Sequence, residues 1–405
     1  MCFRISSHLH PPAKSYQVTS LMQYRFFDKP VDQTRSAGLD KLRFLLAMWV
    51  LLAHAVGWGV YTGAMDSDGV PSQIGRAFVW IFQRDGETHP AVLAFIVLSG
   101  YCIHRNGFRI NRAFCLITYG IRRFFRIFPV YFLASLLGVV VWFAGVNADA
   151  SATKALTGTD SITTWGLFNK LTGFSSFIPS LHTTGWQGNA PLTTAIVEAW
   201  LYVFYGFVAW FVARGYSLRA LVFSAVIIWM MTLWYVHLNP ENLGWWHNGS
   251  FISFALYWWV GAFLAETQQP PKAKSQKPKA KSQKPKAKKF YGIAVSISLC
   301  LVGAGSIGGD VVIVELRKIG LATIFGLLIQ WVDQNWRSET ALAKAGLAGY
   351  CIYALHAPLL IILLVKGVSL VLAISSVFMA ACLCHFAFEQ PLLEIGKRLS
   401  VRAAH

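Results

Sequence analysis

Apolar runs that are long, or nearly long, enough to cross a membrane constrain this chain more than any other feature. A spanning helix needs about 20 apolar residues, because the hydrocarbon core is about 30 Å thick and only a closed backbone hydrogen-bond pattern is stable within it. We therefore expect an all-α, polytopic membrane protein with about ten transmembrane helices. The runs lie at 42–60, 90–104, 127–146, 193–213, 219–238, 250–266, 290–308, 316–332, 346–366 and 367–388.

The composition agrees with a membrane protein. Hydrophobic residues make up 55% of the chain and charged residues only 13%, which excludes an ordinary soluble enzyme. The net charge of +18 does not predict nucleic-acid binding, because nine lysines lie in one segment, 272–289. Few basic residues fall in segments that are external when the N-terminus is inside, so we expect both termini in the cytoplasm. These external residues are Arg76, Arg84, Lys154, Lys170, Arg317, Lys318 and Lys366.

The chain divides around one membrane domain. We expect a cytoplasmic N-terminal segment at 1–38, an integral-membrane domain at 39–399 and a C-terminal tail at 400–405. Within the domain, 267–289 carries a tandem Pro-Lys-Ala-Lys-Ser-Gln-Lys repeat, which predicts a flexible cytoplasmic linker or, alternatively, a partner-binding segment. The longest external segment, 147–192, is where a polar substrate would be recognised.

An arginine and a histidine share one side of the first run. Arg43 and His54 are eleven positions apart, which brings them to within roughly 20° of the same helical face with a rise of about 16 Å. His54 therefore lies near the middle of the membrane, where an ionisable side chain is costly and usually functional. Alternatively, Arg43 is an interfacial anchor and His54 a structural histidine bonded between helices.

Two further polar residues lie at depth. Glu198 is the one acidic residue well inside a predicted span, and His356 is at the middle of the ninth run, before Pro358, which should free a backbone carbonyl. With His54 they offer a general base, a group that orients it and a contact for an incoming hydroxyl. The alternative is that Glu198 and His356 satisfy each other or a neighbouring helix.

Three arginines, Arg122, Arg123 and Arg126, precede the third run. Guanidinium groups bind phosphate oxygens in pairs, so the cluster predicts either a polyphosphate ligand or contact with lipid headgroups. His385 and Glu389, four residues apart, are interpreted as a helix-end pair. The cysteines show no metal-type spacing, and we expect no metal site.

Six segments, in order, resemble the membrane-bound acyltransferase family 3. Two positions depart from the family pattern: Thr193-Thr194-Ala195 stand where it usually has Trp-Ser-Leu, and Gln390 stands where a basic residue is common. The similar segments are the Arg43-x10-His54 pattern, Phe95 to Ile103, the R-x-x-R element at Arg123 and Arg126, Asn189 to Tyr202 through Glu198, Tyr350 to Pro358, and Phe388 to Pro391.

This resemblance implies an O-acyltransferase of the bacterial inner membrane. Such an enzyme moves an acyl group, most often acetyl, from cytoplasmic acyl-CoA to a hydroxyl of a cell-surface glycan or lipid-linked saccharide, with membrane lipids around it and no permanently bound cofactor. Arg43, Arg123 and Arg126 would hold the donor, and Ser99 and Tyr101 would shape the tunnel wall. His54 would be a general base or a nucleophile that carries the acyl group. The alternative is a transporter or flippase with buried His and Glu as a proton relay.

Overall fold

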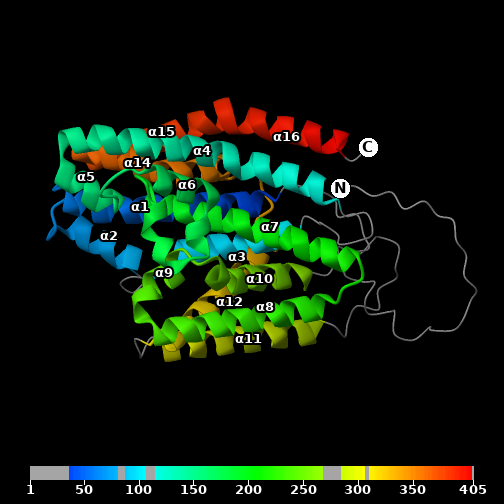
Figure 1. Ribbon diagram of the computed structural model, residues 1–405. Helices are drawn as coiled ribbons and strands as arrows, with labels where there is room; N and C mark the ends of the chain where they lie inside the picture. Colours follow the sequence, from blue (N-terminus) through cyan, green and yellow to red (C-terminus); the bar gives the residue numbers. More distant parts are fainter. Residues whose placement is uncertain (1–35, 81–86, 106–114, 268–283, 306–309, 404–405) are drawn as a thin grey trace, which may run out of the picture.

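Helices lying side by side make up the described part of the chain (Figure 1). A computed structural model describes residues 36–80, 87–105, 115–267, 284–305 and 310–403. Within these residues every regular element is a helix, which confirms the all-α class. The predicted N-terminal segment, apart from 36–38, and most of the Lys-rich linker lie outside the described residues.

The helices fall into a long and a short group. The long ones are α1 (Ala37–Tyr61), α3 (Pro90–Arg105), α4 (Leu116–Ala148), α7 (Thr193–Ala213), α8 (Leu218–Leu238), α10 (Phe251–Glu266), α11 (Lys284–Gly305), α12 (Val311–Asn335), α14 (Gly349–Val365), α15 (Leu370–Cys384) and α16 (Gln390–Arg402). The short ones are α2 (Val70–Trp80), α5 (Ala150–Thr157), α6 (Thr164–Thr172), α9 (Leu243–Asn248) and α13 (Ala341–Ala345). Five-residue and three-residue turns connect them: a π-helical turn at His385–Glu389 and 3-10 turns at Phe174–Ser176, Pro179–Leu181, Thr183–Gly185, Ala190–Leu192, Pro240–Asn242 and Gly346–Ala348.

The lengths and apolar character of these helices identify a multi-pass membrane protein. In the part of the chain that the structure describes, six helical stretches are long and apolar enough to cross a membrane, and three shorter apolar helices accompany them. Each of the ten predicted runs falls on a helix, but the number that cross the membrane stays a prediction. Figure 1 shows the start of α1 and the end of α16 at the same end of the bundle. Which side of the membrane this end faces also stays a prediction.

Close packing of α3 against α10 depends on two glycines. A Cβ atom on Gly100 would lie 2.0 Å from the carbonyl oxygen of Trp258, and one on Gly261 would lie 1.9 Å from that of Val97. Small residues at these positions let the two backbones approach, as is common between membrane helices. On its other sides α3 packs against α1, α7 and α12, while α14 packs against α1, α4 and α15. Five helices, α1, α3, α4, α7 and α14, thereby surround a common space.

Helix α12 corrects one expectation about charge. It begins at Val311 rather than at 316, so Glu315 lies within it and is only 1% exposed. Helix α12 is not among the stretches long and apolar enough to span a membrane, so the prediction that Glu198 is the one acidic residue well inside a span stays a prediction. Arg317 and Lys318, which we expected in an external segment, are buried in the same helix. They are tolerated because Arg317 pairs with Glu87 and Lys318 pairs with Glu315.

Two predicted connections also contain more structure than expected. Helix α11 begins at Lys284, inside the predicted linker 267–289. The predicted external loop 147–192 contains α5, α6 and four 3-10 turns, and it buries Lys170 at 3% exposure. Hydrogen bonds between side chains and backbone carbonyls join this segment to the membrane helices. The Tyr131 hydroxyl of α4, for example, donates to the carbonyl of Lys170.

Candidate active site

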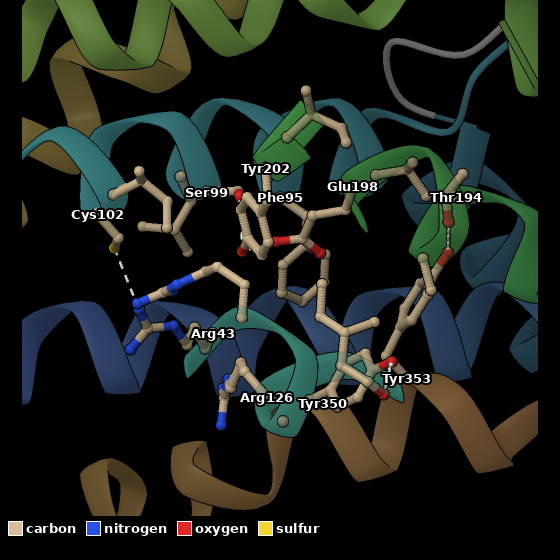
Figure 2. A pocket seen from close by; sticks show the side chains of 18 residues that line it. Arg43, Phe95, Ser99, Cys102, Arg126, Thr194, Glu198, Tyr202, Tyr350 and Tyr353 are labelled. Atoms are coloured by element: carbon tan, nitrogen blue, oxygen red, sulfur yellow. Dashed lines mark hydrogen bonds between the residues drawn. The ribbon is translucent and has the colours of Figure 1, made fainter. Parts of the chain in front are cut away.

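The space between α1, α3, α4, α7 and α14 is a cavity of about 990 Å³, including the space that is open to solvent (Figure 2). Its walls are mostly apolar, with arginines, tyrosines and one carboxylate among them. The lining residues are Arg43, Val92, Phe95, Ile96, Leu98, Ser99, Cys102, Ile103, Arg123, Arg126, Ile127, Thr194, Ala195, Glu198, Tyr202, Gly349, Tyr350 and Tyr353.

Three arginines that were predicted to bind the donor line the cavity. Arg43 of α1 donates from Nη1 to Asp40 Oδ1 at 2.5 Å and from Nη2 to Cys102 Sγ at 3.1 Å. Arg123 of α4 lies over the Tyr202 ring, 5.5 Å from its centroid, and Arg126 lies one turn further along. Both arginines lie in the N-terminal third of α4 (Leu116–Ala148). Their guanidinium groups make this part of the cavity suited to an anionic ligand.

A chain of hydrogen bonds runs along the middle of the cavity wall. The Trp258 indole donates to Ser99 Oγ at 3.3 Å, and Ser99 donates to the Tyr202 hydroxyl at 3.0 Å. Tyr202 in turn donates to Glu198, four residues earlier on α7. Glu198 is half-buried and lines the cavity, so its carboxylate is oriented by its own helix and remains able to contact a ligand.

Tyr353 and Thr194 close the other end of the cavity. Their hydroxyl groups are hydrogen-bonded, as the dashed line in Figure 2 shows. Tyr353 also donates to the carbonyl of Pro191 at 2.9 Å, and its ring packs edge-on against Phe95. Figure 2 shows this pair on the side opposite Arg43 and Cys102. The cavity therefore extends from the arginines to Tyr353.

The structure brings His54 and His356 together just beyond Tyr353. His54 Nδ1 is 2.9 Å from His356 Nε2, and the two rings stack with centroids 4.9 Å apart. His356 Nδ1 lies 2.6 Å from the carbonyl oxygen of Tyr353. A carbonyl only accepts, so His356 Nδ1 carries a proton, and in the neutral pair His356 Nε2 accepts from His54 Nδ1. This tautomer leaves His54 Nε2 unprotonated, as a base or a nucleophile requires.

Pro358 frees a backbone carbonyl of α14, as predicted, and a residue of the segment 147–192 donates to that carbonyl. Proline has no N–H to donate to Ala354, four residues earlier in α14. Asn189 Nδ2 donates to this carbonyl at 3.2 Å. The Lys170 ammonium group donates to the carbonyl of Asn189 at 3.0 Å and to that of Trp186 at 2.6 Å. The segment 147–192 is thus bonded to α14 next to His356.

Four predicted site residues are not among those that line the cavity: His54 and His356, which lie beside Tyr353, and Tyr101 and Arg122, which bond elsewhere. The Tyr101 hydroxyl donates to Asp333 Oδ2 at 2.8 Å, and Arg122 Nε donates to Ser400 Oγ at 2.9 Å. Neither side chain is among those that line the cavity. Helical geometry explains this, because Tyr101 is two positions from Ser99 and so projects about 200° away from it, while Arg122 is offset by about 100° from Arg123.

Sequence reasoning gave no role to several cavity residues. Cys102, Thr194, Tyr350, Tyr353 and Phe95 all line the cavity. The spacing in the sequence could have identified them. Each lies three, four or seven positions from a predicted site residue or from another residue of this group, and residues at such spacings share one helical face.

One cluster of possible metal ligands lies beside the arginines. Cys351, His385 and Glu389 are buried, and one ligand atom from each lies within 4.8 Å of the others. Glu389 also forms an ion pair with Arg126, with Nη1 to Oε1 at 2.8 Å. The sequence analysis found no metal-type spacing because the cluster joins α14 to the π-helical turn, 34 residues later.

Comparison with known proteins gives one finding. A protein-family model described as an acyltransferase domain matches residues 36–388. No curated protein matches the chain, and no solved structure matches it.

Proposed function

Because this match covers most of its length, the chain belongs to acyltransferase family 3, and we propose that it transfers an acyl group across the membrane as an O-acyltransferase. The donor is an acyl-CoA, with acetyl-CoA first, from the cytoplasm. The acceptor is a hydroxyl of a cell-surface glycan or a lipid-linked saccharide at the outer side of a bacterial inner membrane. Family membership favours this transferase over the transporter alternative.

One observation carries the proposal. The cavity has arginines at one end, and Tyr353 at the other end contacts His356 of the histidine pair. Coenzyme A has a phosphate-rich end and a long, mostly apolar arm that carries the thioester. Arg43, Arg123 and Arg126 suit the phosphates, since guanidinium groups bind phosphate oxygens in pairs. The apolar walls suit the arm, and along α1 the rise from Arg43 to His54 is about 16 Å. The thioester would therefore lie near Tyr353 and His54.

Two chemical routes fit the His54–His356 pair. As a general base, His54 Nε2 takes the proton of the acceptor hydroxyl while the hydroxyl oxygen attacks the thioester carbonyl. His54 then gives this proton to the sulfur of CoA, which leaves as the thiol. As a nucleophile, His54 Nε2 attacks the thioester and CoA leaves as the thiolate. The oxygen of the acceptor hydroxyl then displaces the acyl group from the imidazole, and the proton that the hydroxyl loses goes to the thiolate. In both routes His356 holds the tautomer in which Nε2 of His54 is free.

Glu198 and the external segment are assigned to the acceptor. Glu198 is the carboxylate that lines the cavity, and it lies one turn from Thr194 at the end that Tyr353 closes. A carboxylate accepts hydrogen bonds from saccharide hydroxyls. The segment 147–192 is bonded to α14 beside His356 through Asn189, so an acceptor held there lies close to the histidine pair.

The direct test uses membranes that contain the protein as it exists. Inverted vesicles receive acetyl-CoA with a labelled acetyl group, and mass spectrometry follows the surface glycan and the lipid-linked saccharides. A mass gain of one acetyl group that depends on the protein is expected. Accumulation of a solute without any label on a saccharide or another hydroxyl compound would contradict the proposal and favour transport.

A further inference from the structure

The carboxylate of Glu389 gathers three side chains from three separate elements. Its Oε1 accepts from Arg126 Nη1 of α4 at 2.8 Å. Its Oε2 accepts from His385 Nδ1 at 2.7 Å and from Cys351 Sγ of α14 at 3.2 Å. Glu389 is 1% exposed and His385 is 4% exposed, so solvent does not compete for these bonds. The carboxylate is therefore fixed in place before any ligand arrives.

The backbone around Glu389 departs from the α-helix at this point. Residues His385–Glu389 form a π-helical turn, in which the N–H of Gln390 bonds the carbonyl of His385 five residues earlier. Pro391 follows and has no N–H to continue the α-helical pattern. Such single turns of π-helix are frequent at functional sites. His385, on this turn, and Cys351 of α14 both donate to the same oxygen of Glu389.

Arg126 is the only one of these four side chains that also faces the cavity, among the residues that the structure describes. It lines the cavity and keeps 32% of its side chain exposed, whereas Glu389 keeps 1%. Its guanidinium group also lies over the Tyr350 ring, 6.0 Å from the centroid. The ring and the carboxylate together leave the guanidinium little freedom to turn, so its remaining N–H groups are aimed before a ligand binds. Pre-organisation of this kind lowers the cost of binding.

We propose that Glu389, held by His385 and Cys351, is a positioning residue that aims Arg126 at the phosphates of the acyl donor. This inference rests on the proposed function, since it takes CoA as the ligand of the cavity. The predicted pairing of His385 with Glu389 is present in the structure, and the proposal adds the contacts of Glu389 with Arg126 and Cys351. The C-terminal part of the chain, through its π-helical turn, thereby takes part in donor recognition without touching the donor.

The test measures the binding of two probes, CoA and pantetheine, to the full-length protein in detergent. Pantetheine has the arm of CoA but none of its phosphates. Glu389→Gln should weaken CoA binding about tenfold, as expected for loss of a charge-assisted contact that orients an arginine, and should leave pantetheine binding unchanged. Glu394→Gln, the same change on an exposed carboxylate of α16, is the matched control and should leave both unchanged.

A double-mutant cycle separates positioning from general damage to the fold. In an Arg126→Gln background, Glu389→Gln should have no further effect on CoA affinity, because the residue that it positions is absent. Cys351→Ser, which keeps a hydrogen-bond donor, should retain CoA affinity within about twofold.

Three results would overturn the inference and leave the proposed function standing. The first is an equal loss of CoA and pantetheine binding in Glu389→Gln. The second is tighter CoA binding, which would show that the carboxylate competes with phosphate for Arg126. The third is one zinc ion per chain that is lost in His385→Ala, which would make the cluster a metal site. Absence of CoA binding by the unmodified protein would instead contradict the proposed function itself.

Discussion

Two regions of this molecule bury charge, and they do so in opposite ways. Around α12, the charge network of Glu87, His247, Glu315, Arg317 and Lys318 is closed on itself. Lys318 donates to Glu315 Oε1 at 2.9 Å and lies 3.1 Å from His247 Nδ1, and the Arg317 and Lys318 side chains keep only 6% and 3% of their surface exposed. At the cavity, Arg43 and Arg126 keep 28% and 32% exposed although both have carboxylate partners.

The difference shows which buried charges indicate a binding site. In the α12 network, two cations meet two carboxylates at close range, and the indole of Trp246 donates to Glu315 at 2.9 Å. The cost of removing these charges from water is offset within the network. At the cavity, three guanidinium groups face a hollow space that one carboxylate also lines. Charge that faces a cavity is available to a ligand, whereas charge that is closed on itself holds helices together.

The largest expected effect comes from breaking the α12 network. Glu315→Gln keeps the shape of the side chain but leaves Lys318 without its carboxylate, which should lower the free energy of unfolding by about 3–5 kcal/mol. Thermal unfolding of the protein in detergent measures this, with Glu241→Gln on an exposed carboxylate as the control. CoA affinity of the folded fraction should not change. Loss of CoA binding with unchanged stability would place the network in the binding site and remove the distinction between the two regions.

An intermediate effect is expected from two neighbouring arginines of α4. Arg123→Gln should raise the Kd of CoA by about tenfold to thirtyfold, because it removes a cation that faces the cavity. Arg122→Gln should change it by less than about twofold, because Arg122 bonds Ser400 outside the cavity. Titration of both variants with CoA compares the same chemical change at adjacent positions. Equal losses of CoA affinity in the two variants would mean that an arginine need not face the cavity to contribute to CoA binding.

A smaller effect is expected from Lys170, a buried cation bonded only to carbonyl oxygens in its described contacts. Burial lowers the pKa of Lys170 from 10.5 to about 7. Between these two values the unfolded chain holds a proton that the folded chain lacks, so the free energy of unfolding should rise by about 1.4 kcal/mol per pH unit. Below pH 7 both states are protonated and this contribution vanishes.

Lys170→Met isolates this contribution. Unfolding of the two proteins is compared at pH 6.5, 7.5 and 8.5, and the difference between them should grow above pH 7 in the sense that the unmodified protein gains stability. A difference that does not vary with pH would mean that Lys170 keeps its ordinary pKa. The segment 147–192 would then accommodate a buried charge as the α12 network does.

Much of the fold follows from hydrophobic length alone. The ten apolar runs locate helices because a membrane leaves a long apolar segment little choice of structure. The boundaries of α12 were predicted less well, since Glu315, Arg317 and Lys318 look like a polar connection until their partners are known. Those partners come from other segments of the chain, and hydropathy along one segment contains no information about them.

The candidate site was predictable where one helix contains the pattern. Arg43 and His54 share a face of α1, and the depth of His356 placed it near His54, which it contacts. The role of Tyr353 was not predictable, because it depends on a carbonyl that fixes a tautomer and a hydroxyl that reaches Thr194 on another helix. The same limit applies to Glu389, whose partners lie on α4 and α14.

The most direct test of the central claim is acyl transfer by His54→Ala. Membranes with matched amounts of the unmodified protein, of His54→Ala and of Gly57→Ala receive labelled acetyl-CoA, and the acylated glycan is quantified by mass spectrometry. Gly57 lies on the same helix with open space around it and serves as the control. A fall of about 10²-fold or more in His54→Ala, with Gly57→Ala unchanged, is the predicted result. Full activity in His54→Ala would show that His54 is structural and would contradict the account.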